Sequence, residues 1–136
     1  MTDPLKHGFV DVPADIDSEW WWTALANQKL LLPCCDGCRR FFFPPQPTCP
    51  YCGSIEWRRV ESAGVGHVYS WVVIHVPLNP AFVDDTPYTI VAVELDEGVR
   101  LLGRLRQETA LAAGMRMTSI FYEVGDKTLL GFEPSS

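Results

Sequence analysis

Two short cysteine pairs, Cys35-Asp36-Gly37-Cys38 and Cys49-Pro50-Tyr51-Cys52, decide how the middle of this sequence folds. Two residues between the thiolates of each pair let a tight turn direct both sulfurs at one ion, and two such turns complete a tetrahedron. Four thiolates leave no open coordination position, so we expect a structural zinc ion. Iron in a rubredoxin-like site and a site that has lost its metal are the alternatives. A ribbon of roughly 30 residues is too small to be held together by apolar burial, which is why it needs a metal.

All five cysteines of the chain lie between positions 34 and 52. A disulfide framework would spread its bridges along the chain, so this clustering favours metal binding. Cys34 is left over. It is interpreted as a small side chain on the strand that enters the first turn; the alternative is a reactive thiol, although no His and Asn or Asp pair with it in a recognisable pattern.

Composition restricts the class of protein further. The chain has 136 residues, 47% of them apolar and 21% charged, which is typical of a folded domain. Its net charge of −6 argues against a protein that coats nucleic acid or anionic lipid. No apolar run approaches the roughly 20 residues of a membrane span, and the N-terminus lacks the order of a signal peptide. We therefore expect a cytoplasmic protein with no membrane association.

The sequence divides into three predicted segments. Residues 1–29 form an acidic N-terminal segment with a helix from about Ser18 to Lys29, in which Ser18 is the N-cap and Glu19 lies in the first turn. Residues 30–60 form the metal ribbon. Residues 61–136 consist of short Val, Ile, Thr and aromatic runs separated by Gly and Pro, which indicates β-structure.

Five strands are expected in the last segment, at 65–76, 89–95, 99–106, 117–124 and 128–132, with a short helical connection at 107–113. In the first strand, alternation places Val68 with Val72 and Ile74 on one face, and His67, Tyr69, Trp71 and Val73 on the other. Five short antiparallel strands with one helical interruption match a small barrel of the OB type, although the order of elements alone also allows other small barrels.

Several aromatic residues are too crowded for one small core. Trp20, Trp21 and Trp22 are consecutive and would fan over roughly 200° of a helix. Phe41, Phe43 and Tyr51 add to the same region. We favour a surface that contacts another subunit or an apolar ligand. The alternative is that helix and ribbon pack on each other and on the barrel and so hide these rings.

Three arginines, Arg100, Arg104 and Arg106, alternate along one predicted strand and could bind the phosphates of a nucleotide-like ligand, although a solvated strand face is the simpler interpretation. Tyr69 and Trp71 could stack on bases, but core packing or contact with another subunit explains them equally well. Asp84 and Asp85 in the Pro-rich loop at 76–87 are interpreted as solvated carboxylates rather than an acid/base pair. No recognised catalytic motif is present in the sequence.

The whole order resembles a known family, catalogued as domain of unknown function number thirty-five, over about Trp20 to Phe121. The resemblance is carried by both cysteine pairs, by Phe43-Pro44-Pro45, by Gly64-Val65-Gly66-His67-Val68-Tyr69-Ser70 and by Pro87-Tyr88-Thr89-Ile90-Val91. One departure is Arg39, which stands where many members have Gly. The resemblance implies an N-terminal helix, a rubredoxin-like zinc ribbon held by Cys35, Cys38, Cys49 and Cys52, and a five-stranded OB-fold.

The resemblance also implies a function. Members act as acyl-CoA-associated accessory subunits of thiolase-like enzymes, in some cases bridging them to a hydratase or synthase, and a similar domain supports a thiolase-fold aldolase of steroid side-chain degradation. Our first hypothesis is therefore a non-catalytic subunit that binds a thiolase-like enzyme, with Arg100, Arg104 and Arg106 as candidates for CoA phosphates. The alternative is an OB-fold protein that binds single-stranded nucleic acid. A stand-alone enzyme of CoA-thioester chemistry is a third, less favoured hypothesis.

Overall fold

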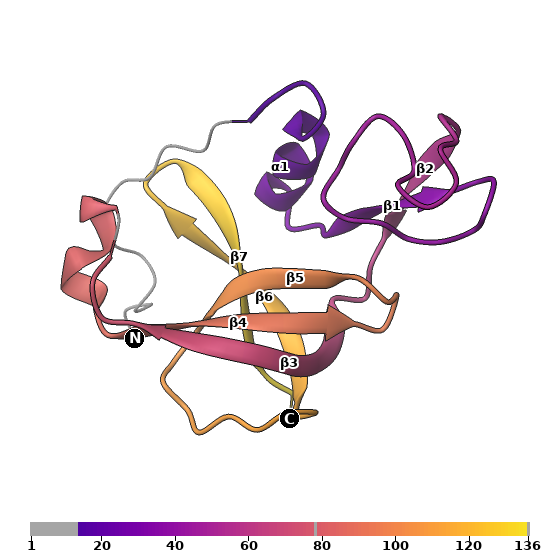
Figure 1. The fold of residues 1–136 in the computed structure, drawn as a ribbon. Coiled ribbons are helices and arrows are strands. Elements are labelled where there is room, and N and C mark those ends of the chain that lie inside the picture. Colours follow the sequence, from indigo (N-terminus) through magenta and orange to yellow (C-terminus); the bar gives the residue numbers. More distant parts are fainter. Residues whose placement is uncertain (1–13, 78, 136) are drawn as a thin grey trace.

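A helix, a two-stranded ribbon and a closed five-stranded barrel follow one another along the chain (Figure 1). The computed structural model describes residues 14–77 and 79–135. The first three elements are α1 (Glu19–Ala26), β1 (Leu31–Cys35) and β2 (Trp57–Glu61). The remaining elements are β3 (Val65–Ile74), the 3-10 helix η1 (Pro80–Asp85), β4 (Tyr88–Leu95), β5 (Arg100–Leu105), β6 (Arg116–Val124) and β7 (Lys127–Pro134). Within the described part of the chain, no helix is long and apolar enough to cross a membrane.

Helix α1 begins after Ser18, as predicted, but it ends at Ala26 rather than at Lys29. The Ser18 hydroxyl does not cap the helix, because it accepts a hydrogen bond from the backbone N–H of Asp15 instead. Gln28 has a φ of 62°, and this left-handed residue turns the chain away from the helical path. The buried face of α1 consists of Trp21, Ala24 and Leu25.

The barrel closes in the strand order β3-β4-β5-β7-β6, and β6 pairs back onto β3. Every pairing is antiparallel except that between β5 and β7, which is parallel and joins Arg104 to Gly131 and Leu105 to Phe132. Alternate residues of β4 point inward, as the strict alternation of its burial shows. The fold class is thus confirmed: mainly β, with an N-terminal helix, a cysteine ribbon and a five-stranded OB-fold barrel. The domain boundaries given above stay a prediction.

The predicted faces of the first barrel strand are wrong beyond Val68. The register of β3 against β4 shifts between Val68 and Ser70, because one extra residue forms a β-bulge. A bulge reverses the alternation, so Trp71 and Val73 follow Val68 on the inner side, and Val72 follows Ser70 on the outer side. The strand also ends at Ile74, before the predicted Val76.

The helical connection predicted at 107–113 is wrong as well, because this segment has no helix. Its end instead lies against β3, where the Gly114 N–H donates to the Val68 carbonyl oxygen at 2.9 Å and the Met115 carbonyl oxygen accepts from the Val68 N–H at 2.9 Å. Glu108 accepts a hydrogen bond from the Thr89 hydroxyl at 2.8 Å. These long-range bonds hold the connection against β3 and β4 in a non-helical path.

Candidate metal centre and surrounding surfaces

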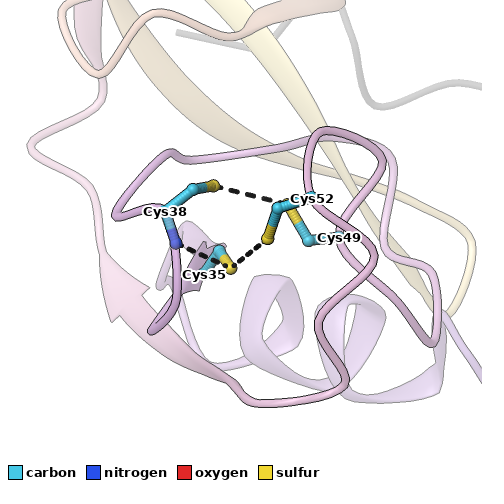
Figure 2. A group of neighbouring side chains, drawn as sticks. All are labelled: Cys35, Cys38, Cys49 and Cys52. Atoms are coloured by element: carbon cyan, nitrogen blue, oxygen red, sulfur yellow. Dashed lines mark hydrogen bonds between the residues drawn. The ribbon is translucent and has the colours of Figure 1, made fainter.

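Four cysteine sulfurs converge at the end of the ribbon, from the turn after β1 and from the loop before β2 (Figure 2). The Sγ atoms of Cys35, Cys38, Cys49 and Cys52 all lie within 4.8 Å of one another. The Sγ atoms of Cys35 and Cys52 are 3.5 Å apart, and those of Cys38 and Cys49 are 3.7 Å apart. Zn–S bonds of about 2.3 Å in a tetrahedron separate the sulfurs by roughly 3.8 Å, so the four side chains fit a zinc ion.

Backbone N–H groups point at the sulfurs, as the two tight turns require. Cys35 Sγ accepts from the N–H groups of Gly37 at 3.3 Å and Cys38 at 3.4 Å, and Cys49 Sγ accepts from the Tyr51 N–H at 3.4 Å. The Cys38 N–H, followed by the Cys52 thiol and the Gly37 N–H, lowers the pKa of Cys35 to about 6. This favours the thiolate, which is the form that binds metal.

Arg39, the residue that departs from the family pattern, has a φ of 66°. Glycine is the residue that adopts this left-handed region without steric cost, which explains physically why a glycine suits the position. The turn nevertheless keeps its hydrogen bonding, since the Arg39 N–H donates to the Cys35 carbonyl oxygen at 3.0 Å. The departure therefore leaves the four sulfurs in place.

Cys34 does not belong to the sulfur cluster. It is buried in β1, and its thiol lies 3.9 Å from the Arg39 carbonyl oxygen. Cys35 and Cys49 are also buried, whereas Cys52 is exposed. Because the four thiolates fill a tetrahedron, a metal held here would have no position left for a substrate, which is the pattern of a structural site.

The crowded aromatic residues lie mostly between helix, ribbon and barrel. Trp20 packs against Trp57 with ring centroids 5.8 Å apart, and Trp21 packs against Phe43 at 5.4 Å and Trp22 at 4.8 Å. Trp21 is only 7% exposed, and Trp20, Trp22, Phe41 and Phe43 are partly buried against the same core. Tyr51 is exposed beneath the Arg40 guanidinium. A role in a partner interface stays a prediction for Trp20, Trp21, Trp22, Phe41, Phe43 and Tyr51.

Each of the three candidate arginines has a carboxylate beside it. Arg104 is buried and donates to Asp85 at 2.7 Å, and its guanidinium lies over the Tyr88 ring. Arg100 pairs with Glu94 at 3.2 Å, and Arg106 pairs with Glu133 at 3.7 Å. These carboxylates offset much of the positive charge that a phosphate would need. Binding of CoA phosphates by the three arginines stays a prediction.

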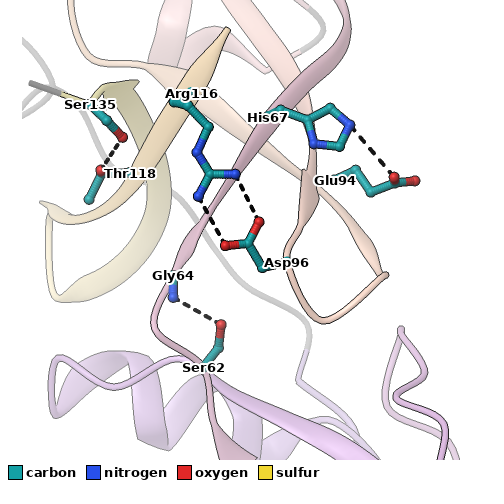
Figure 3. A network of polar contacts seen from close by, with 8 residues as sticks. All are labelled: Ser62, Gly64, His67, Glu94, Asp96, Arg116, Thr118 and Ser135. Atoms are coloured by element: carbon teal, nitrogen blue, oxygen red, sulfur yellow. Dashed lines mark hydrogen bonds and ion pairs between the residues drawn. The ribbon is translucent and has the colours of Figure 1, made fainter. Parts of the chain in front are cut away.

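The outer face around Arg100 is a small polar network. His67 Nε2 lies 3.6 Å from the second Glu94 carboxylate oxygen (Figure 3). The Arg100 guanidinium lies 3.7 Å from the centre of the Tyr69 ring. One face of the Tyr69 ring is therefore covered by a side chain of the same barrel. This leaves less of Tyr69 for base stacking than the nucleic-acid hypothesis needs.

One surface was expected only in part, because contact with another subunit was one interpretation of Tyr69 and Trp71, whereas the exposure of Val72 and Val73 beside them was not predicted. The second half of β3 exposes Tyr69, Trp71, Val72 and Val73 together, and Val76 and Val83 are exposed nearby. The signal in the sequence is the unbroken apolar run Trp71-Val72-Val73-Ile74. The alternation of side chains along a strand assigns half of such a run to a buried face and half to an exposed face. It therefore cannot predict that both faces are exposed.

Comparison with known proteins shows to which family this architecture belongs. The ChsH2 rubredoxin-like zinc ribbon profile matches residues 22–58, and the ChsH2 C-terminal OB-fold profile matches residues 59–121. The chain is also similar to the solved "Ltp2-ChsH2(DUF35) aldolase", with a TM-score of 0.83 and 36% identity over 93% of this chain and 100% of that chain. The chain belongs to the ChsH2/DUF35 family. The predicted family and the zinc ribbon as its metal site are thus confirmed.

Other relatives widen the DUF35 context. The chain is 34% identical over 121 residues to the 3-oxo-4,17-pregnadiene-20-carboxyl-CoA hydratase alpha subunit of Mycobacterium tuberculosis. The aligned region covers 87% of this chain but only 38% of that protein. It is 30% identical over 93 residues to a DUF35 domain-containing scaffold protein of Methanocaldococcus jannaschii, covering 66% of this chain and 65% of that protein. The chain also spans 27% of the length of a Thermomonospora curvata relative named "Probable enoyl-CoA hydratase alpha subunit".

Proposed function

We propose that this chain is a non-catalytic accessory subunit that binds and supports a thiolase-like enzyme acting on acyl-CoA, and connects it to a hydratase. The observation that carries this proposal is the similarity over 93% of the chain to the DUF35 chain of the Ltp2-ChsH2 aldolase. The names of the other relatives, hydratase alpha subunits and scaffold proteins, are consistent with it.

The site chemistry supports a role in assembly rather than in turnover. The metal centre is closed by four thiolates, so its contribution is to the stability of the ribbon. The buried aromatic contacts of α1 then fix the ribbon on the barrel. Such a rigid unit can present an invariant surface to another protein, which is what an accessory subunit needs.

Purification of the tagged chain from its native host, at moderate salt, tests this proposal. Mass spectrometry identifies the proteins that copurify, and the native mass of the complex gives their ratio. We expect a thiolase-like protein in fixed ratio with the chain, and loss of that enzyme's activity when the chain is omitted from the reconstituted complex. Recovery of the chain alone, or with nucleic acid that salt removes, would contradict the proposal and favour the nucleic-acid alternative.

A further inference from the structure

The second half of β3 is a sheet edge: on the side away from β4 it has no neighbouring strand among residues 14–77 and 79–135. On the side away from β4, the start of β3 is paired: Val65–His67 pair with β6, and Val68 exchanges two hydrogen bonds with Gly114 and Met115. From Ser70 to Ile74, β3 pairs with β4 alone. Figure 1 shows β3 along the border of the sheet, running toward η1. Strand backbone groups alternate between the two sides, so part of this segment's N–H and C=O groups face outward from the sheet.

The side chains of this edge are apolar and open on both faces. Val72 is 53% exposed and Val73 is 41% exposed, although successive residues point to opposite faces. Tyr69 and Trp71 are also about half exposed. Natural sheets protect a free edge with a β-bulge, charged residues or proline. The bulge of β3 ends before Ser70, and no charged residue or proline occurs between Tyr69 and Ile74. An unprotected apolar edge on a folded protein therefore indicates that something covers it.

The chemistry of the edge indicates what kind of segment covers it. Outward N–H and C=O groups in an extended row are satisfied by another extended chain, whose own apolar side chains lie beside Trp71 and Val72. A second copy of this chain is disfavoured, because each copy carries a net charge of −6 and the two would repel each other. A strand from a different protein avoids this penalty where that protein is not itself strongly acidic.

We propose that the Ser70–Ile74 edge of β3 receives an extended strand of the thiolase-like partner, which continues the β3-β4-β5 sheet across the subunit boundary. This inference rests on the proposed function and names the segment through which it acts. The hydrogen bonds of the added strand would supply affinity, and the apolar residues on both faces would fix its register.

Amide hydrogen exchange tests the backbone part of the inference. The probe is the thiolase-like protein recovered in the purification described above, and the sample is the intact complex. We expect the amides within 69–74 that do not face β4 to exchange at least tenfold more slowly in the complex than in the free chain. The amides of the exposed β6–β7 turn serve as the internal control and should keep their rates.

A pair of variants tests the side chains. Val72→Lys places a charge on the edge itself, whereas Leu102→Lys places the same charge at an exposed apolar position of β5 that does not lie on the edge. We expect Val72→Lys to weaken partner binding at least tenfold and Leu102→Lys to change it less than twofold. Circular dichroism and metal content should be unchanged in both variants.

The outcomes separate this inference from the proposed function. Binding without added protection at 69–74, or equal loss from both variants, would mean that the partner recognises another surface, and the edge assignment would be wrong while the accessory role stands. Self-association of the free chain with the same amides protected would identify a second copy as the occupant and overturn the inference. Failure to recover any thiolase-like protein would overturn both.

Discussion

Asp96 joins parts of the barrel that are twenty residues apart in sequence. Its carboxylate accepts two hydrogen bonds from Arg116, at 2.8 and 2.9 Å, and its backbone N–H donates to the Val65 carbonyl oxygen at 3.0 Å (Figure 3). The turn after β4 is thereby held against the beginnings of both β3 and β6. The hydrogen bonds from Arg116 lower the pKa of Asp96, because they stabilise the ionised carboxylate.

Asp96→Asn should lower the melting temperature near neutral pH. A carboxyl group whose pKa is lower in the folded state contributes its stability above the unfolded value of about 4, and that contribution disappears as pH falls through the folded value. We therefore expect the difference between wild type and variant to be full above pH about 5 and to vanish in strong acid. Thermal melts from pH 7 to pH 2 measure it, with Asp126→Asn in an exposed turn as the matched control. A difference that persists unchanged in strong acid would contradict the prediction.

At the scale of elements, η1 is tied to β5 by a buried ion pair. Arg104 and Asp85 have side chains that are 9% and 3% exposed, and the Arg104 guanidinium also lies over Tyr88. Both charges are shielded from water, so each depends on the other. The Pro-rich loop before β4 is thus part of the packed molecule, and Asp85 is a structural partner rather than a solvated carboxylate.

Asp85→Ala should destabilise the protein by about 3 kcal/mol, since it leaves the buried Arg104 charge without its partner. Asp84→Ala, next to it and exposed, should change the free energy of unfolding by less than about 0.5 kcal/mol. Urea denaturation measures both. Replacing the pair together, by Asp85→Leu with Arg104→Met, should recover most of the loss. Equal effects of the two single substitutions would contradict the importance of the pair.

Sequence reasoning succeeded where the determinants are local. The spacing of the cysteines fixes the metal site within one short segment, and Gly98 correctly indicates the β4–β5 turn, where its φ is 93°. It failed where contacts with residues distant in the sequence determine the local structure. The bulge after Val68 depends on how β3 fits β4, and the non-helical path of the β5–β6 connection depends on bonds to Val68. Neither partner can be recognised from the local sequence.

At the scale of the whole molecule, the described residues form three apolar clusters, one of them a small cluster of Ile120, Tyr122 and Val124 on β6, and the other two bear on the role of the metal. The larger one joins α1 and β1 to the barrel interior, and includes Leu25, Leu32 and Phe132. The smaller one consists of Cys35, Cys49 and Phe42, with Cys38 and Trp57 against it. The smaller core contains three of the metal ligands, so its stability depends on the metal, whereas the larger one can persist without it.

Cys35→Ser should therefore reduce bound zinc from about one ion per chain to none and expose the smaller core while the barrel stays folded. Metal analysis and amide hydrogen exchange measure the two effects. Cys34→Ser, at a buried thiol outside the sulfur cluster, should keep the zinc. Retention of zinc and of ribbon protection in Cys35→Ser would contradict the structural role of the site.

The tryptophans fall into two groups, so their fluorescence reports on two different parts of the molecule. Trp20, Trp21, Trp22 and Trp57 belong to the helix and ribbon, where their rings contact one another or neighbouring phenylalanines. The fifth, Trp71, stands about half exposed on the border strand of the barrel. Comparison of wild type with Trp71→Phe would isolate the emission of that single indole. Changes in its wavelength would then follow events at the sheet border, while the remaining four report on the ribbon.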